Sequence, residues 1–300
     1  MKTLKIGVVI PSWSYWRDPI KLQPLWELYY ATLISEFSDN YLVDVIDTRA
    51  VGGKCNSISI PERDIYLFWI MKSADAPECY ELSASLKKIH PNCVCIAGGT
   101  HVDFVRQECC QHFDYALRGT GEEQLRYIIE KISTNQIVED EYLSIKSGHF
   151  KEYNHAKRSF IAPEFVVNRE HFSRYGGVLG TGVYFSRGCN FKCKFCVYNN
   201  PSKFEFKTGS QITNEIEYLK TSYGVEGVNL RDEVCLPPNK KVAFDYLDGI
   251  GKSNVIWRGQ SVPFADEDVV RIAAESGLKE LALGIESVDS NLVLEIYNKP

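Results

Sequence analysis

Three cysteines lie close together in the second half of the sequence, at Cys189, Cys193 and Cys196. They are spaced by four residues and then three, so one short segment carries three thiols whose thiolates can converge on a metal. With 10 cysteines in 300 residues, this spacing is expected by chance about 0.01 times (roughly 290 starting positions times one-thirtieth cubed). The spacing therefore indicates a metal centre more strongly than a chance grouping of buried thiols.

The number of ligands distinguishes the two metal centres that cysteines commonly build. A structural zinc site takes four protein ligands, and here the fourth would be Cys235 or a histidine, because no second CxxC pair follows. An iron–sulfur cluster held by three cysteines instead leaves one iron open to bind another molecule. The sequence favours the iron–sulfur cluster, with the zinc site as the alternative.

The composition is that of a folded protein of about two domains. Hydrophobic residues make up 44% and charged residues 24% of the chain, which excludes disordered, collagen-like and coiled-coil proteins. A formal net charge of −5 gives no excess of positive charge for a polyanion, so no nucleic-acid partner is expected. No apolar run is long enough to span a membrane, and residues 5–13 are too short for a signal-peptide core. The cysteines are therefore expected as thiols in the cytoplasm.

Residues 1–135 predict a doubly wound, Rossmann-like parallel sheet of the α/β class, because apolar strands alternate with helices. Strands are expected at 6–10, 41–46, 65–70, 93–97 and 115–117, and helices at 22–37, 76–90, 102–112 and 121–133. Since connections between parallel strands are right-handed, ligand-binding loops are expected at the carboxyl ends of the strands.

Residues 136–180 are polar, contain Pro163 and end in the glycine-rich stretch Gly176–Gly182, so they are predicted to form a linker. Over residues 181–300 a second alternation follows, with strands at 183–186, 225–230, 254–258 and 279–285 and helices at 209–222, 239–250, 265–276 and 289–297. Four strand–helix units are typical of part of a (β/α) barrel. The barrel is expected to be truncated after the fourth unit.

The cysteine segment resembles the signature of radical S-adenosylmethionine (SAM) enzymes, which is CxxxCxxC on the loop after the first strand of a (β/α) barrel. Cys189, Cys193 and Cys196 match its cysteines, and Phe195 matches the aromatic residue that usually precedes the third. The resemblance implies a 4Fe–4S cluster whose open iron is chelated by the amino and carboxylate groups of SAM. It also implies reductive cleavage of SAM to a 5′-deoxyadenosyl radical that abstracts hydrogen from the substrate, with water and oxygen excluded.

Polar residues at the ends of the next two strands resemble positions that face SAM in this family. Residues 229–233 carry Asp232 and Glu233 in place of the usual Gly-Gly-Glu, and one of them would face the methionyl amine. Arg258 belongs to the segment 257–260 that ends the third strand, and it is a further candidate for SAM binding. Stabilisation of a helix N-terminus is the alternative role for the carboxylates.

A Gly-x-Glu-Ser turn follows the fourth strand and resembles the turn of one large subgroup of the family. Its residues Glu286 and Ser287 would meet the ribose or the methionyl moiety of SAM. Asn298 and Lys299 follow at the usual spacing of that subgroup. An exposed charge at the start of a helix is the alternative role for Glu286.

The first domain resembles the cobalamin-binding domain that precedes the barrel in one radical SAM subgroup. The resemblance lies in residues 98–101, Gly-Gly-Thr-His, after one buried strand and in residues 118–123 after the next. It implies cobalamin contacts from Gly98, Gly99, Thr100, Gly119, Gly121 and Glu122. The loops at 12–16 and 71–74 are candidates at the same edge. Glycines would let a flat ligand approach the backbone, and simple turn glycines are the alternative.

One departure from other cobalamin proteins concerns the histidine that binds cobalt from below. None of the six histidines lies in an Asp-x-His-x-x-Gly motif, and His101 is interpreted as a loop residue. Many members of the subgroup lack this motif, so the resemblance implies cobalamin bound without a protein histidine.

Together the resemblances imply a cobalamin-dependent radical SAM enzyme, a class B-like methyltransferase acting on an unactivated carbon or a phosphinate phosphorus. The expected partners are a small-molecule or peptide substrate and an electron donor such as flavodoxin or ferredoxin, with no membrane. A radical rearrangement or cyclisation enzyme is one alternative, and a non-catalytic iron–sulfur or scaffold protein is another. The sequence names no substrate.

Overall fold

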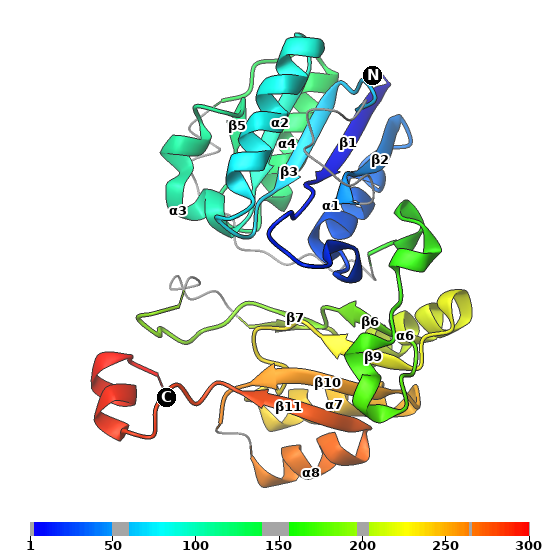
Figure 1. Cartoon of the computed structure of the whole chain (residues 1–300), viewed down its shortest axis with the longest axis vertical. Coiled ribbons are helices and arrows are strands. Elements are labelled where there is room, and N and C mark those ends of the chain that lie inside the picture. The colour runs from blue at the N-terminus through cyan, green and yellow to red at the C-terminus, as the bar shows by residue number, and fades with distance from the viewer. Residues whose placement is uncertain (1–2, 50–59, 140–155, 197–203, 264–265, 300) are drawn as a thin grey trace. The chain divides into compact units, whose positions relative to one another are not determined.

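The computed structural model describes residues 3–49, 60–139, 156–196, 204–263 and 266–299. The chain forms two compact units, Met1–Ala162 and Pro163–Pro300, each with its own sheet (Figure 1). The boundary lies inside the segment 136–180, which the sequence predicts as a linker.

The first unit is built on a five-stranded sheet with the order β2-β1-β3-β4-β5, and all its strand pairs are parallel. Its strands are β1 (Leu4–Ile10), β2 (Tyr41–Asp47), β3 (Ile65–Trp69), β4 (Val94–Gly98) and β5 (Tyr115–Ala116). Every residue of β3 is buried, as expected for a parallel strand that is covered on both faces.

Two helices cover each face of this sheet. The helices are α1 (Leu25–Ser35), α2 (Ala76–Ile89), α3 (Thr100–Cys109) and α4 (Glu122–Ser133). Leu33 of α1 and Leu125 of α4 share one hydrophobic core with the sheet, while Leu82 of α2 and Val102 of α3 belong to the core on the other face. The predicted doubly wound sheet is confirmed.

The strand order creates a point where the winding changes direction. Because β1 lies between β2 and β3, the chain leaves β1 to one side and later returns to its other side. In doubly wound sheets, ligands bind outside the carboxyl ends of the two strands at this point. Here these are β1 and β3, and we call their carboxyl ends and the loops that follow them the switch-point edge.

The second unit contains a four-stranded parallel sheet with the order β11-β10-β9-β6. Its main elements are β6 (Gly180–Val183), α6 (Gly209–Tyr223), β9 (Gly227–Leu230), α7 (Lys240–Lys252), β10 (Ile256–Ser261), α8 (Glu267–Glu275) and β11 (Leu278–Leu283). Val183, Leu230 and Trp257 are buried in one core with residues of these helices. Because side chains alternate along a strand, Asn229 and Arg258 lie on the opposite face. The predicted strand–helix alternation of a partial barrel is confirmed.

The first strand of the second unit begins earlier than the sequence predicts. Strand β6 starts at Gly180 and pairs with β9 from Gly227 onward, so the strand predicted at 183–186 begins three residues too late. The cause is Phe172, whose ring fills the space beside both glycines. A Cβ added to Gly180 or Gly227 would lie 2.6 Å from this ring. The glycines therefore make room for an aromatic side chain inside a regular strand.

The segment after β11 is helical over residues 290–296, within the range predicted for a helix at 289–297. Its residues Leu292–Ile296 form a π-helix, in which the amide of Tyr297 donates to the carbonyl of Leu292 at 2.9 Å. This wide turn is followed by Asn298 with a positive φ of 49°. A second feature that the sequence did not predict is the antiparallel pair β7 (Ser186–Arg187) and β8 (Glu205–Phe206).

Candidate functional site

The three clustered cysteines lie on the loop that follows β7, and all three are half-buried. Burial raises the pKa of Cys189 and of Cys193, and the charges of the neighbouring thiolates raise both further. The thiols are therefore close enough to repel one another once ionised. A bound cation would relieve this repulsion and keep the thiolates deprotonated.

The donor set fits a cluster better than a single metal ion. Within the described ranges, no three histidine, cysteine, aspartate or glutamate side chains are grouped so that they could hold one metal ion. In a four-iron cluster each cysteine binds a different iron, so the sulfurs lie farther apart than the ligands of a single ion. Cys235, the fourth ligand of the zinc alternative, is fully buried in the hydrophobic core. With Cys235 in the core, the three thiols of this loop suit a cluster that leaves one iron open.

The segment after β11 holds the cysteine loop in place. The carbonyl of Tyr297 accepts a hydrogen bond from the amide of Lys194 at 2.9 Å, and Asn298 Nδ2 donates to the carbonyl of Lys192 at 3.1 Å. The ring of Phe195 packs edge-on against Tyr297, with the ring centres 5.5 Å apart. Phe195, which the sequence singles out as a candidate for cofactor binding, is half exposed beside the cysteines.

A buried cation lies beside the same loop. The ammonium of Lys299 is 2.7 Å from Glu286 Oε1 and 5.7 Å from the centre of the Phe195 ring. Its positive charge lowers the pKa of Cys193 and so opposes the effect of burial. Glu286 thus reaches the cysteine loop through Lys299, whereas the hydroxyl of Ser287 accepts a hydrogen bond from the amide of Asp289 in the turn.

The two candidate carboxylates after β9 have different environments. Asp232 is fully buried, and its Oδ1 accepts hydrogen bonds from the amides of Phe185 at 2.9 Å and Ser186 at 3.1 Å. Its Oδ2 accepts a hydrogen bond from the Tyr246 hydroxyl at 2.6 Å. Burial raises the pKa of Asp232 to about 6 although these hydrogen bonds oppose the shift. Asp232 ties the residues before the cysteine loop to α7, and both its oxygens are already bonded within the protein.

Glu233 has an oxygen that the protein leaves unsatisfied. Its Oε2 is buried and has no hydrogen-bond partner among the described residues. Burial, together with the charge of Asp232, raises the pKa of Glu233 to about 7, and the charge of Glu233 in turn raises the pKa of Cys189. An unbonded buried carboxylate oxygen is costly, and a ligand ammonium would satisfy it. Of the two candidates, Glu233 has the environment suited to facing an amine.

Arg258 is the third residue of β10. This strand ends at Ser261, one residue later than the predicted end at residue 260. The guanidinium of Arg258 is 2.7 Å from Glu280 Oε1 on β11 and donates to the carbonyl of His171 at 3.1 Å. Arg258 therefore joins two strands on the face away from the helices. At the carboxyl end of β10, the Ser261 hydroxyl is buried and has no hydrogen-bond partner among the described residues.

The glycines of the first unit are required by packing within the protein. A Cβ on Gly98 would lie 2.2 Å from the Trp69 ring, and a Cβ on Gly99 would lie 2.5 Å from the carbonyl oxygen of Ile70. Gly119 and Gly121 each have a positive φ of 67°, a conformation that favours glycine. The fold thus explains these glycines, and their contact with cobalamin stays a prediction.

The polar candidates of the same two loops also have partners inside the protein. The Thr100 hydroxyl is 3.8 Å from the sulfur of Met71. Glu122 is buried and accepts a hydrogen bond from the hydroxyl of Tyr29. Contact of these two residues with cobalamin likewise stays a prediction.

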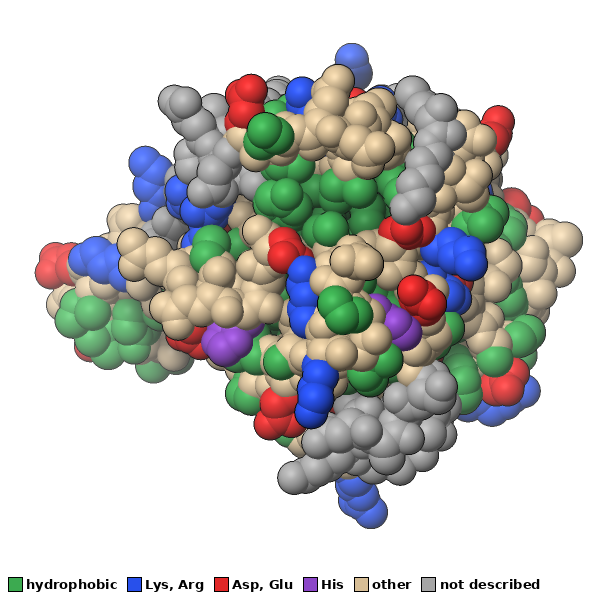
Figure 2. Space-filling model, turned by 90° about the horizontal axis from the view of Figure 1, so that it is seen from above, with side chains coloured by type: hydrophobic (Ala, Val, Ile, Leu, Met, Phe, Trp, Pro, Cys, Tyr) green, Lys and Arg blue, Asp and Glu red, His purple; other side chains and the backbone are tan. Residues whose placement is uncertain are grey.

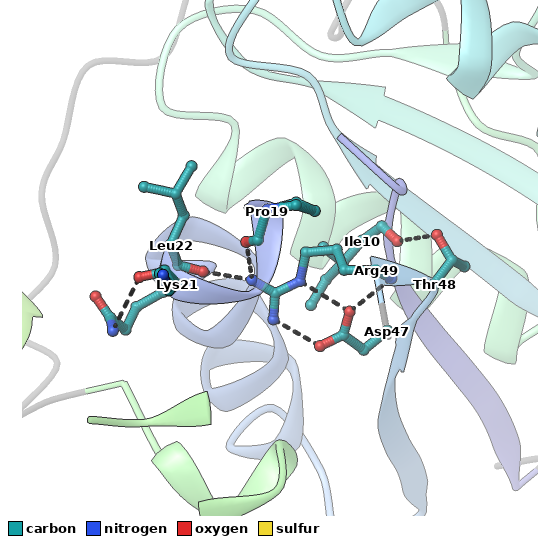
Figure 3. A network of polar contacts seen from close by, with 8 residues as sticks. Ile10, Pro19, Lys21, Leu22, Asp47, Thr48 and Arg49 are labelled. Carbon is teal, nitrogen blue, oxygen red and sulfur yellow. Dashed lines mark hydrogen bonds and ion pairs between the residues drawn. The ribbon is translucent and has the colours of Figure 1, made fainter. Parts of the chain in front are cut away.

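A buried arginine fixes the loop after β1 to the end of β2 (Figure 3). The guanidinium of Arg49 donates to both carboxylate oxygens of Asp47, at 2.8 and 2.6 Å. It also donates to the carbonyls of Pro19 and Leu22. These contacts hold the segment 11–22 against the carboxyl edge of the sheet. We call Arg49 and Asp47 the arginine clamp.

The clamped segment places aromatic side chains at the switch-point edge. Lys72, from the loop after β3, lies 4.4 Å from the centre of the Trp16 ring and 5.9 Å from that of Tyr15. Tyr15 and Trp16 are 45% and 42% exposed. The loops after β1 and β3 are therefore in contact, and they present aromatic surface on which a flat ligand can stack.

Sequence reasoning missed the arginine clamp and the contact of Lys72 with the aromatic loop. A signal for the clamp was present, because Asp47 and Arg49 directly follow an apolar strand and therefore lie at the edge that binds ligands. The sequence offers no comparable signal that brings Lys299 to Cys193.

On the face shown in Figure 2, basic and acidic side chains both lie among apolar ones. Among the described helices, none has both the length and the apolar character needed to cross a membrane.

Comparisons with known proteins give a consistent result. Residues 183–300 match the family model described as the radical SAM superfamily. The whole chain is 26% identical to "Uncharacterized methyltransferase PH0819" of Pyrococcus horikoshii and covers 69% of that protein. Over 94% of its length it is 23% identical to the bacteriochlorophyllide d C-8(2)-methyltransferase of Chlorobaculum tepidum, of which it covers 62%.

Among solved structures, the chain is similar to the radical SAM methyltransferase TsrM from Kitasatospora setae, whose structure contains cobalamin and a 4Fe–4S cluster. The match has a TM-score of 0.73 and 12% identity, and it covers 100% of this chain and 61% of TsrM. At this level of identity the likeness concerns the fold. The chain spans about six to seven tenths of the length of these three proteins.

Proposed function

We propose that the chain acts as a cobalamin-dependent radical SAM methyltransferase on an unactivated carbon or a phosphinate centre. Residues 183–300 match the model of the radical SAM superfamily. The observation that carries the proposal is the extent of the similarity. The P. horikoshii protein, named a methyltransferase, and TsrM each match 100% of this chain. A radical SAM domain with an unrelated partner domain would match these proteins only over the second unit.

In this proposal Cys189, Cys193 and Cys196 hold a 4Fe–4S cluster. The bound cluster and SAM supply a radical that abstracts hydrogen, and bound cobalamin supplies the methyl group. The unsatisfied Glu233 oxygen accepts the ammonium of the SAM methionyl group. Lys299 offsets the negative charge of the thiolates, because its ammonium acts on Cys193.

The first unit offers cobalamin a site at the switch-point edge. Tyr15 and Trp16 supply exposed aromatic surface there, and the arginine clamp fixes the segment that carries them. His101 does not supply a cobalt ligand in this proposal, because both its ring nitrogens are hydrogen-bonded to other side chains. The cofactor would thus be bound without a protein histidine below cobalt.

The proposed chemistry also requires a reducing environment. We propose a cytoplasmic location and a one-electron donor such as flavodoxin or ferredoxin. All cysteines in the described part of the chain are free thiols, as such a compartment permits.

The first test is anaerobic reconstitution of the chain with iron and sulfide, followed by visible absorption and electron paramagnetic resonance of the reduced protein. Wild-type protein should give a reducible 4Fe–4S signal that shifts on addition of SAM. Cys193→Ala should lose the signal, and Cys235→Ala serves as the matched control because this thiol lies in the core. Zinc binding, or a folded protein without any cluster, would contradict the proposal.

The second test concerns the reaction. Hydroxocobalamin should bind the reconstituted protein, and a methylated product should form only when cobalamin is present. A methylated product formed without cobalamin would remove the cofactor from the proposal. An isomerised or ring-closed product would instead favour a radical rearrangement or cyclisation enzyme.

A further inference from the structure

A chain of polar side chains connects the loop after β3, at the switch-point edge, to α3 and α2. His101 lies in the first turn of α3, directly after the glycine pair. Its Nδ1 shares a hydrogen bond of 3.0 Å with the hydroxyl of Ser73, in the loop after β3. Its Nε2 shares a second hydrogen bond of 3.0 Å with the hydroxyl of Tyr80 on α2.

Tyr80 is itself fixed, which makes it a rigid support for His101. Its ring stacks on His112 with the ring centres 3.9 Å apart and an interplanar angle of 6°. Its hydroxyl also lies 3.5 Å from the sulfur of Cys109. Burial lowers the pKa of His101, so the imidazole stays neutral near pH 7. His101 is therefore held in one orientation with no ring nitrogen left over for a metal.

Of Ser73, His101 and Tyr80, only Ser73 is exposed. It lies next to Lys72, whose ammonium contacts the exposed Trp16 ring. A hydroxyl can donate one hydrogen bond and accept two, and His101 takes up one of these positions. The Ser73 hydroxyl can therefore form further hydrogen bonds at the switch-point edge. Its hydrogen bond to the buried imidazole of His101 determines how the hydroxyl is oriented.

We propose that His101 is a positioning residue that orients the Ser73 hydroxyl to form a hydrogen bond with a polar side group of bound cobalamin. The inference rests on the proposed function, since it names residues that would bind the same cofactor. The corrin ring carries amide side groups around its rim, and these can donate or accept such a bond. His101 acts through Ser73 and does not itself touch the cofactor.

The test is the affinity of the folded protein for hydroxocobalamin, measured by visible absorption in equilibrium dialysis. Ser73→Ala and His101→Gln should each weaken binding by about threefold to tenfold, which corresponds to the loss of one hydrogen bond. His101→Asn should keep nearly wild-type affinity, because its amide occupies the position of Nδ1 and still bonds Ser73. Ser83→Ala is the matched control: Ser83 is a buried serine of α2 that donates to the carbonyl of His112.

A double variant separates positioning from a general structural effect. Ser73→Ala combined with His101→Gln should bind no more weakly than Ser73→Ala alone, because the two residues act as one unit. Additive losses, or an equal loss in Ser83→Ala, would overturn the inference. Circular dichroism verifies the fold of each variant, and Ser73→Ala changes only an exposed side chain.

The two possible failures can be distinguished. If the wild-type protein does not bind hydroxocobalamin, the cobalamin part of the proposed function is wrong and this inference falls with it. If the wild-type protein binds hydroxocobalamin and Ser73→Ala binds it equally well, only the inference about His101 and Ser73 is wrong.

Discussion

Both units place their candidate site at the carboxyl edge of a parallel sheet, but they hold it in place by different means. At the switch-point edge, Arg49 is 30 and 27 residues from Pro19 and Leu22, whose carbonyls it binds. The cysteine loop is instead held by contacts such as that of Lys192 with Asn298, which are 106 residues apart. The segment at the switch-point edge is therefore held by residues close to it in the sequence. The cysteine loop is held in place only when the residues after β11 are folded against it.

The largest expected effect comes from breaking the arginine clamp. Arg49→Met leaves the Asp47 carboxylate and two carbonyls without their donor in a buried place, at a cost of about 3–5 kcal/mol. Lys21→Met is the control, because it breaks an exposed ion pair with Asp18 that contributes about 0–1 kcal/mol. Urea unfolding measures both. Equal losses would show that the clamp does not stabilise the switch-point edge.

A second prediction concerns the pH dependence of the first unit. Burial raises the pKa of Glu27, in the first turn of α1, from 4.5 to about 8. The folded state then binds this proton more tightly than the unfolded chain, so the contribution of Glu27 to stability falls as pH rises from about 4.5 to about 8. In Glu27→Gln, the free energy of unfolding should therefore decrease less with rising pH than in the wild type. The difference should be a few kcal/mol, at about 1.4 kcal/mol per pKa unit.

Urea unfolding at pH 5 and at pH 8.5 tests the prediction for Glu27. Glu36→Gln, which changes an exposed glutamate just after the same helix, should keep the wild-type dependence. If Glu27→Gln keeps it as well, Glu27 is not the group responsible.

A third prediction sharpens the contrast between the two sites. Lys299→Met leaves Glu286 without its partner and should weaken the packing of the segment after β11 by about 1–2 kcal/mol. Hydrogen–deuterium exchange should become faster at residues 186–196 and stay unchanged at residues 11–22. Arg49→Met should give the opposite pattern. Faster exchange at both places in either variant would mean that the two sites are not independent.

The smallest expected effect comes from a single hydrogen bond. Asn298→Gly removes the bond from Nδ2 to the carbonyl of Lys192 and keeps the positive φ of 49°, which glycine adopts readily. The loss should be about 0.5–1.5 kcal/mol and should appear as faster exchange at residues 192–196. Asn298→Ala adds backbone strain at the same position, so it should lose more than the glycine variant.

The fold was accessible from the sequence because its signals are local. Apolar runs such as residues 65–69 and 94–98 identify the strands, and their alternation with amphipathic segments determines the sheet type. The cysteines were visible for the same reason, since their spacing lies within a single loop. The contacts of Lys299 with Phe195 and of Phe172 with Gly180 were not visible, because the sequence does not show which distant side chains meet.

The candidate site was predicted unevenly. The sequence placed Asp232 and Glu233 together and could not separate them, because the difference lies in hydrogen bonds from Phe185, Ser186 and Tyr246 that form only in the folded chain. The sequence also suggested that the glycines at positions 98, 99 and 121 let a ligand approach the backbone. In the structure these glycines make room for Trp69, Ile70 and Leu117.

The ring of Phe172, which fills the space beside Gly180 and Gly227, determines how the chain can be divided for experiments. Phe172 precedes residue 183, where the radical SAM match begins. A fragment cut at that residue would lose this ring and most of β6, and it would leave Gly227 of β9 without the side chain that covers it. Cutting between Ala162 and Pro163 keeps the ring, so only that fragment is expected to behave as an independent domain in solution.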